Sequence, residues 1–300
     1  MNRAIPPRLE RTGELWAYGY CCTCPVMTDI GDRRRALLLR RGAHHDSPAG
    51  ISEEIVVARK TWFKSGLLKR FGPWPRRVVT VAVIVALWPI LMTFVYAVVP
   101  PPASNLMITR LVNGNGITYD WVSLDQISPY LPLAVVSSED ARFCSHNGVD
   151  WIEFSDVLDE ATDGDGEGPI RGASTISMQT AKNLFLWDGR NPIRKVLELP
   201  LAYWMDLVWT KRHMIEVYLN IVEWAPGVYG AEAAARYHFK KSAAKLTRRE
   251  AALLAAVLPN PIKRSAGKPS KRVTGVAGRI MARMNIMGPY VTCLGLRSPL

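Results

Sequence analysis

The stretch VVTVAVIVALWPILMTFVYAVV runs from Val78 to Val99, and its 22 residues include no charged side chain. At about 1.5 Å per helical residue, this length is sufficient to cross a hydrocarbon core of about 30 Å. Pro89 interrupts the stretch, but membrane helices tolerate proline better than helices in water do. We therefore predict a single transmembrane helix over residues 78–99. A cleaved signal peptide has a shorter apolar region that begins near residue 1, and a buried core helix is rarely this long.

The two flanks of this stretch differ in charge. Pro100–Met107 has no charged residue, whereas the N-terminal side is rich in lysine and arginine. The basic residues nearest to the stretch are Lys60, Lys64, Lys69, Arg70, Arg76 and Arg77. Because positively charged flanks tend to stay in the cytoplasm, we expect residues 1–77 to be cytoplasmic and residues 100–300 to be extracytoplasmic.

The net charge of +12 indicates an anionic partner, which could be nucleic acid, a membrane surface or a phosphorylated substrate. Residues 1–77 contain 15 Lys and Arg against 7 Asp and Glu, so most of the excess lies beside the predicted span. This placement favours anionic lipid over nucleic acid. Residues 1–50 have no sustained helical or strand period, and we interpret residues 1–77 as a basic, disordered tail.

The cysteines give no sign of a disulfide framework. Cys21, Cys22 and Cys24 precede the span, lack paired C-x-x-C spacing and are interpreted as a chance cluster rather than a metal site. Cys144 and Cys293 would be exported, but their separation in sequence says nothing about contact, and we predict no disulfide framework. The segment 162–168, TDGDGEG, is predicted to be a flexible loop.

The exported part is predicted to be mainly α-helical, without internal repeats. In KRHMIEVYLN, residues 211–220, the apolar Met214, Ile215, Tyr218 and Leu219 share one helical face. Thr247 and Glu250 have capping-box spacing before AALLAAVL, and Pro259 ends that helix. Alternating apolar and polar residues, which indicate a strand, occur only around Leu111–Val122.

Three segments combine residues that suit chemistry on an anionic, oxygen-rich ligand. EDARFCSHNGVD, residues 139–150, begins with two carboxylates, and a carboxylate near an aromatic group can act as a general base when burial raises its pKa. RGASTISMQTAKNL, residues 171–184, presents hydroxyl, amide and ammonium groups at helical spacing. GRNPIRKVLE, residues 189–198, offers guanidinium groups that can bind a diphosphate bidentately.

In this order, EDARFCSHNGVD, GASTISMQTAKN, RKVLE, KRHMIEVYLN and GVYGAEAAARYHF resemble the five motifs of the peptidoglycan glycosyltransferase (transglycosylase) family. The resemblance covers roughly Leu131–Pro261 and is closest to the monofunctional branch. It implies a lysozyme-like, mainly α domain that follows one membrane helix and polymerises lipid II into β-1,4 glycan by an inverting single displacement, releasing undecaprenyl diphosphate. The expected location is the periplasmic face of the bacterial inner membrane.

The resemblance also implies roles for individual residues. Glu139 matches the catalytic base, and Glu198 matches a second essential carboxylate near the diphosphate. Substrate-binding positions are matched by Ser174, Thr175, Gln179, Lys182, Asn183, Arg190, Arg194 and Lys195. A magnesium or manganese ion could bridge the diphosphate, although the sequence shows no closed set of ligands. The implied partners are lipid II, the growing lipid-linked strand, the cytoplasmic membrane and other cell-wall synthesis proteins, with no nucleic acid.

The sequence departs from the family pattern and leaves other functions open. Met178 stands where the family usually has a first glutamine, and Ala173, Ser177 and Ala225 replace a glycine, a threonine and a glycine. A lysozyme-like lytic enzyme is the main alternative, but a hydrolase of neutral glycan has no use for the cationic cluster. A bifunctional transpeptidase needs more chain than follows Pro261. A non-enzymatic scaffold would not depend on Glu139.

Overall fold

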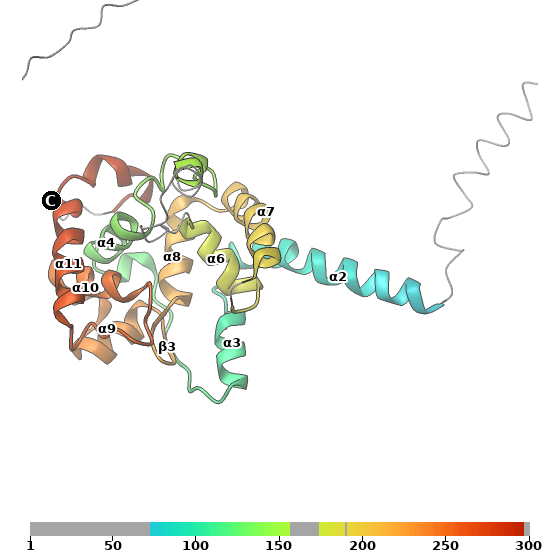
Figure 1. Cartoon of the computed structure of the whole chain (residues 1–300), viewed down its shortest axis with the longest axis horizontal. Helices are drawn as coiled ribbons and strands as arrows, with labels where there is room; N and C mark the ends of the chain where they lie inside the picture. The colour runs from blue at the N-terminus through green and yellow to red at the C-terminus, as the bar shows by residue number, and fades with distance from the viewer. Residues whose placement is uncertain (1–72, 157–173, 190, 297–300) are drawn as a thin grey trace, which may run out of the picture. The chain divides into compact units, whose positions relative to one another are not determined.

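The computed structural model describes residues 73–156, 174–189 and 191–296. This part of the chain is mostly helical (Figure 1), as predicted. Several predictions fall outside the described residues. They concern the cysteine cluster at 21–24, residues 1–72 of the predicted basic tail at 1–77, the loop at 162–168 and Arg190. The principal helices are α2 (Pro73–Tyr96), α3 (Asn105–Val112), α4 (Tyr130–Glu139), α6 (Ile176–Phe185), α7 (Pro192–Val208), α8 (Lys211–Ile221), α9 (Ala231–Phe239), α10 (Arg248–Val257) and α11 (Lys271–Met284), with short 3-10 helices η2 (Leu124–Gln126), η3 (Ala243–Lys245) and η4 (Gly288–Leu294).

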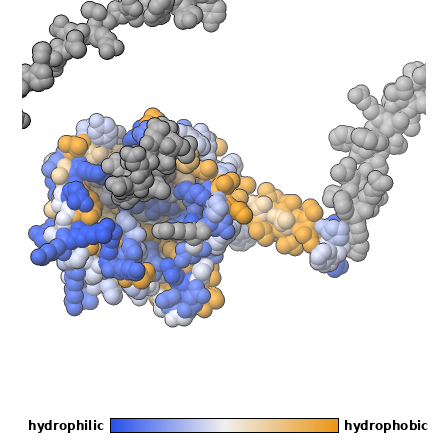
Figure 2. Space-filling model, in the orientation of Figure 1, coloured by the Kyte–Doolittle hydropathy of each residue, from blue (hydrophilic) through white to orange (hydrophobic). Residues whose placement is uncertain are grey.

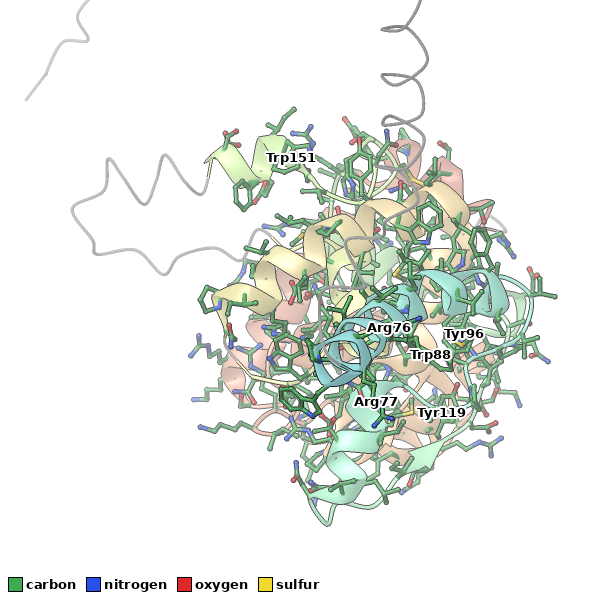
Figure 3. The ribbon with its side chains drawn as sticks, turned by 90° about the vertical axis from the view of Figure 1, so that its right-hand side faces the viewer. Arg76, Arg77, Trp88, Tyr96, Tyr119 and Trp151 are labelled. Carbon is green, nitrogen blue, oxygen red and sulfur yellow. A yellow bond between two sulfur atoms is a disulfide. The ribbon has the colours of Figure 1, made fainter. Side chains whose placement is uncertain are left out.

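Helix α2 is the predicted membrane span, with both ends displaced towards the N-terminus. Among the described residues it is the one helix that is long and apolar enough to cross a membrane. Its apolar side chains are mostly exposed and form a continuous hydrophobic surface (Figure 2), as a helix in lipid requires. Arg76 and Arg77 lie near its start and Tyr96 at its end (Figure 3). The basic flank therefore includes the first turns of the helix itself.

The last turn of α2 is attached to the domain that follows it. The indole Nε1 of Trp209 donates to the carbonyl of Thr93 at 2.8 Å, and Nε2 of His213 donates to the carbonyl of Tyr96 at 2.8 Å. Phe94 also packs edge-on against Trp204, with ring centroids 5.6 Å apart. The Tyr96 carbonyl at the helix end thereby gains a partner from outside the helix, and the Thr93 carbonyl, which also accepts from the N–H of Ala97 at 3.1 Å, gains a second donor. The membrane helix and the domain are thereby joined by side chains as well as by the chain itself.

Helix α4 lies in the core of the domain. Every residue from Leu131 to Ser137 is buried, because the helix is apolar on all sides. It packs against α10 and α11, while α6 packs against α7 and α8. The predicted apolar face of α8 is confirmed, since Met214, Ile215, Tyr218 and Leu219 are fully buried. The predicted capping box of α10 is also confirmed.

The strand content is small and differs from the prediction. The sheet contains β1 (Thr118–Tyr119), β3 (Val228–Tyr229) and β2 (Glu223–Ala225), in that order. β1 runs parallel to β3, with Thr118 beside Val228, and β2 pairs with β3 in the antiparallel sense. The strand signal at Leu111–Val122 was therefore wrong for most of its length. Leu111 and Val112 end helix α3 instead, because a capping box at Ser104 starts a helix that continues through them.

The prediction of no disulfide framework was wrong for Cys144 and Cys293. They form a disulfide, with Cα atoms 5.8 Å apart across a sequence separation of 149 residues. Sequence spacing could not indicate this pair, since contact over such a separation depends on packing. The bond joins the loop after α4 to η4 near the C-terminal end of the described chain.

Candidate active site

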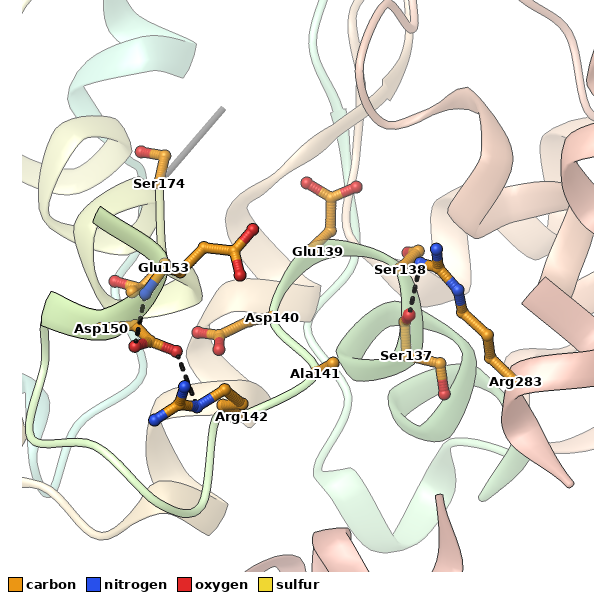
Figure 4. Close-up of a pocket in the computed structure, with 11 residues that line it drawn as sticks. Ser137, Ser138, Glu139, Asp140, Ala141, Arg142, Asp150, Glu153, Ser174 and Arg283 are labelled. Atoms are coloured by element: carbon orange, nitrogen blue, oxygen red, sulfur yellow. Dashed lines mark hydrogen bonds and ion pairs between the residues drawn. The ribbon is translucent and has the colours of Figure 1, made fainter. Parts of the chain in front are cut away.

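Glu139 is the last residue of α4 and faces a cavity of about 490 Å³ (Figure 4). Because the preceding helix has no charged residue, Glu139 brings the first charge to the point where α4 leaves the core. The cavity also contacts the following loop, the start of α6 and helix α11. Its walls are formed by Ser137, Ser138, Glu139, Asp140, Ala141, Arg142, Asp150, Glu153, Ser174, Thr175 and Arg283.

A chain of two hydrogen bonds orients the Glu139 carboxylate. The hydroxyl of Tyr218 donates to Oε1 of Gln179 at 3.0 Å, and Nε2 of Gln179 donates to Oε2 of Glu139 at 3.1 Å. Burial, and then the charges of Glu139 and Asp140, raise the pKa of Tyr218 well above its usual value, so its hydroxyl keeps its proton and acts as a donor. Since Oε1 of Gln179 is thereby engaged, the amide presents its NH₂ group to the carboxylate.

The pKa of Glu139 is raised above 4.5. Burial is the largest cause, and the charge of Asp140 acts in the same direction. The hydrogen bond from Gln179 and the positive charges of Arg264 and Lys182 lower the pKa but do not cancel the effect of burial. A carboxylate whose pKa is shifted towards neutrality accepts a proton more readily, as a general base must.

Asp140 connects the end of α4 to the start of α6. Both of its oxygens contact Nε2 of His146, at 3.0 and 3.1 Å, and Oδ2 accepts a hydrogen bond from the backbone N–H of Ile176 at 3.0 Å. A carboxylate at a helix N-terminus is favoured by the unpaired N–H groups there. Asp140 therefore holds α6, and with it Gln179, at a fixed position beside Glu139.

Gly148 allows the loop after α4 to pack closely. Its φ is +77°, and a Cβ at this position would lie 2.6 Å from the carbonyl oxygen of Ala202 in α7. The Gly148 carbonyl accepts a hydrogen bond from Thr175 Oγ1 at 2.6 Å, and that hydroxyl also caps α6 by accepting from the N–H of Met178. Thr175 therefore lines the cavity, while its hydroxyl is engaged within the protein.

A cationic cluster surrounds Glu198 on α7. Glu198 is buried and pairs with Arg194 through Oε1 and with Lys195 through Oε2, the latter at 3.2 Å. Nζ of Lys195 also donates to Oγ of Ser174 at 2.8 Å, and Ser174 lines the cavity of Glu139. The two predicted catalytic carboxylates are thus linked through Lys195 and Ser174, although Glu198 does not itself line the cavity.

Lys182 lies within the electrostatic reach of both carboxylates. Burial and the charge of Arg194 lower its pKa, while Glu198 raises it. The positive charge of Lys182 in turn lowers the pKa of Glu139. This mutual influence places Lys182 in the same region as Glu139 and the Glu198 pair.

Asn183 is a predicted site residue with an unsatisfied group. It is buried, and its Oδ1 has no hydrogen-bond partner among the described residues. An unpaired buried polar atom costs free energy, so it is a point at which a ligand donor could bind.

Sequence reasoning missed several residues that shape this site. Tyr218 was assigned only to an apolar face, and its hydroxyl reaches Gln179 because α8 packs against α6. Arg142 pairs with Asp150 at 3.3 Å, which holds the loop beneath the cavity. Arg283 comes from α11, beyond the segments quoted above. No local signal could have identified it, because its place depends on how α11 packs against α4.

The described residues do not fit a closed metal site. They contain no group of three or more His, Cys, Asp or Glu side chains that could hold an ion. Asp150 and Glu153 share the cavity with Glu139, but Asp150 already pairs with Arg142 and accepts from the N–H groups of Ile152 and Glu153. A magnesium or manganese ion usually needs octahedral oxygen ligands, several of them from water or phosphate. No step proposed below depends on a metal.

The chain is similar in sequence to a family of known proteins. Residues 105–285 match the family model described as Transglycosylase. The chain is 50% identical over 225 residues to a protein named biosynthetic peptidoglycan transglycosylase from Agrobacterium fabrum, covering 75% of this chain and 98% of the relative. It is 49% identical over 215 residues to a protein of the same name from Brucella suis, covering 71% and 95%. A relative of that name from Rhizobium meliloti is 52% identical over 193 residues, covering 64% and 80%.

Proposed function

The chain belongs to the transglycosylase family, and from this premise we propose that it polymerises lipid II into linear β-1,4 glycan strands of peptidoglycan. The donor is the growing lipid-linked strand, and the acceptor is the lipid-linked disaccharide pentapeptide. One observation carries the proposal. The cavity that Glu139 faces is also lined by Ser174, whose hydroxyl accepts from Lys195, so the base lines this space and a cationic group lies one hydrogen bond behind its wall.

The reaction is a single displacement. Glu139 removes the proton from the 4-hydroxyl of the acceptor sugar as that oxygen attacks the anomeric carbon of the donor. A new glycosidic C–O bond forms while the bond from the anomeric carbon to the diphosphate oxygen breaks, and the electron pair leaves with undecaprenyl diphosphate. Attack from the face opposite an α-linked diphosphate gives a β linkage, so no covalent enzyme intermediate is required.

Lys182, Arg194 and Lys195 stabilise the diphosphate as its negative charge develops. Glu198 acts through two of these cations rather than on the sugar. Its side chain is buried, and its two oxygens pair with Arg194 and Lys195 and hold these cations in place. We therefore assign Glu198 as a positioning residue. This refines its expected role as a second catalytic carboxylate.

Two independent features support the proposed membrane orientation. Arg76 and Arg77 at the start of α2 favour a cytoplasmic N-terminus, which places the domain after α2 on the outer face of the cytoplasmic membrane. The disulfide between Cys144 and Cys293 favours the same side, since disulfides persist in the periplasm and outside the cell but rarely in the cytosol. The lipid-linked substrates would then reach the domain from the membrane surface.

Incubation of the purified full-length protein with fluorescent lipid II tests the proposal. Wild-type protein should produce lipid-linked polymer that lysozyme digests. Replacing Glu139 with Gln keeps the side-chain shape but removes the base, and we expect polymer formation to fall by about 10³-fold. Asp156→Asn is the matched control, because Asp156 is an exposed carboxylate on the helical segment 151–156 and lies outside the cavity lining.

Three outcomes would contradict the proposal in different ways. Equal polymer from wild type and Glu139→Gln would remove Glu139 as the base. Failure of the wild-type protein to form polymer would reject the polymerase function. Release of soluble fragments from preformed glycan, in place of polymer, would favour the lytic alternative.

A further inference from the structure

A second, smaller cavity lies beside Glu139, between α10 and α11. Its volume is about 200 Å³, and it shares Ser138, Glu139 and Arg283 with the larger cavity. The rest of its lining consists of small or apolar side chains and one more arginine, namely Ala255, Ala256, Pro259, Val276, Arg279 and Ile280. Glu139 therefore lines both cavities, and each cavity can hold part of a different substrate, the donor or the acceptor.

Arg279 and Arg283 lie one helical turn apart on α11 and are both exposed. Like charges at this spacing repel each other unless an anion lies between them. Within residues 73–156, 174–189 and 191–296, neither guanidinium forms an ion pair with a carboxylate. Nη1 of Arg283 instead donates a long hydrogen bond, 3.5 Å, to the carbonyl of Ser137, which directs this side chain towards the end of α4 (Figure 4).

Arg194 and Lys195, two other cations of the site, are already engaged. Arg194 and Lys195 pair with Glu198, and Lys195 also reaches Ser174 at the wall of the larger cavity. This cluster suits the diphosphate that leaves the donor. Arg279 and Arg283 of α11 instead line the cavity between α10 and α11, next to the end of α4. Because neither pairs with a carboxylate among the described residues, they are available for a different anion.

We propose that Arg279 and Arg283 bind phosphate or carboxylate oxygens of the acceptor substrate and thereby bring its sugar hydroxyl to Glu139. This inference rests on the proposed function. The base must contact the acceptor hydroxyl, so the acceptor has to occupy space next to Glu139 that the leaving group does not fill. The smaller cavity offers such space. The acceptor carries both a diphosphate and peptide carboxylates, and guanidinium groups bind either kind of oxygen bidentately.

Kinetics with separate donor and acceptor test this assignment. A preformed lipid-linked glycan strand serves as donor and lipid II as acceptor, and each concentration is varied while the other is saturating. The variants are Arg279→Gln, Arg283→Gln and the double variant of full-length protein. We expect the double variant to raise the KM for the acceptor about tenfold, with the KM for the donor and kcat within about twofold of wild type.

Arg272→Gln is the matched control, because Arg272 is an exposed arginine of α11 that lines neither cavity. Its kinetics should equal those of wild type. Circular dichroism should show unchanged helix content for every variant, since the replaced side chains are exposed. A general structural defect would alter kcat and both KM values together, whereas loss of an acceptor contact alters one.

The outcomes separate this inference from the proposed function. An unchanged acceptor KM in the double variant would overturn it, and so would an increase confined to the donor KM. In both cases wild-type protein still makes polymer, and the proposed function stands. An acceptor that lacks the pentapeptide identifies the anion: the defect persists if the arginines bind the diphosphate and disappears if they bind peptide carboxylates.

Discussion

Glu139 accepts one hydrogen bond from an amide, whereas Glu198 is paired with two cations. Glu139 ends helix α4 and Glu198 lies within helix α7, and both lie in the same cationic region. Burial without an ion-pair partner raises the pKa of Glu139, while burial with Arg194 and Lys195 ties Glu198 to its neighbours. The difference shows that surroundings, rather than residue type, make one carboxylate reactive and the other a support.

The largest expected effect is on the free energy of unfolding, and it differs between variants of Glu139 and Glu198. Glu198→Gln leaves the largely buried Arg194 without a carboxylate, and we expect it to lower the free energy of unfolding by about 3–5 kcal/mol. Glu139→Gln should not lower it, since the amide replaces a carboxylate whose charged form burial disfavours. Urea unfolding followed by circular dichroism measures both.

The exposed ion pair of Arg212 and Asp125 supplies the control for this comparison. Asp125→Asn should cost no more than about 1 kcal/mol, because solvent screens the pair. Similar losses of unfolding free energy for Glu198→Gln and Glu139→Gln would contradict the assignment of Glu198 as a positioning residue and Glu139 as the reactive group.

The disulfide should stabilise the side of the site that contains Glu139 more than the side that contains Glu198. Replacing Cys144 and Cys293 with Ala removes a cross-link across 149 residues, and we expect a loss of about 3 kcal/mol in unfolding free energy. Hydrogen exchange should increase first in residues 140–150 and in η4. Equal loss of protection in α7 would show that the disulfide acts on the whole domain instead.

The pH profile tests the raised pKa of Glu139. Glycan synthesis should fall about tenfold for each pH unit below this pKa, because only the ionised carboxylate can accept a proton. We expect the acidic limb of kcat/KM to lie above pH 4.5, the ordinary value for the group. Asp156→Asn should leave this limb unchanged, and a limb at or below 4.5 would contradict the assignment.

The raised pKa of Glu139 also makes the stability of the folded protein depend on pH. Because the folded pKa of Glu139 exceeds the unfolded one, the folded state binds this proton more tightly. Its contribution to stability is complete below the unfolded pKa and is lost as pH rises through the window between the two values. Glu139→Gln should remove this part of the pH dependence of unfolding.

The smallest expected effect concerns the support of Glu139. Tyr218→Phe removes the hydroxyl that orients Gln179, and we expect a loss of about 1 kcal/mol in stability and a decrease of roughly tenfold in kcat. The pH limb assigned to Glu139 should also move, since its hydrogen bond from Gln179 becomes less well oriented. An unchanged limb and rate would show that Gln179 holds its position without Tyr218.

Much of the site could be predicted because its motifs are local. Helical spacing predicted that Gln179 and Lys182 share a polar face, whereas Glu139 and Ser174 were assigned through the family resemblance. The pairing of Glu198 with Arg194 is also local, because residues four apart face each other on a helix. Arg283 and Tyr218 were missed because their contacts with the site cross between helices.

The sequence alone determined the uncharged span before the domain, the buried face of α8 and the cap of α10. These features depend on periodicity and on neighbours within a few residues, which the order of side chains specifies directly. The tertiary structure alone decided the Cys144–Cys293 bond, the Tyr218–Gln179–Glu139 chain and the junction of two cavities at Glu139. Such contacts join residues tens to more than a hundred positions apart, and only the packing of helices against one another brings them within bonding distance.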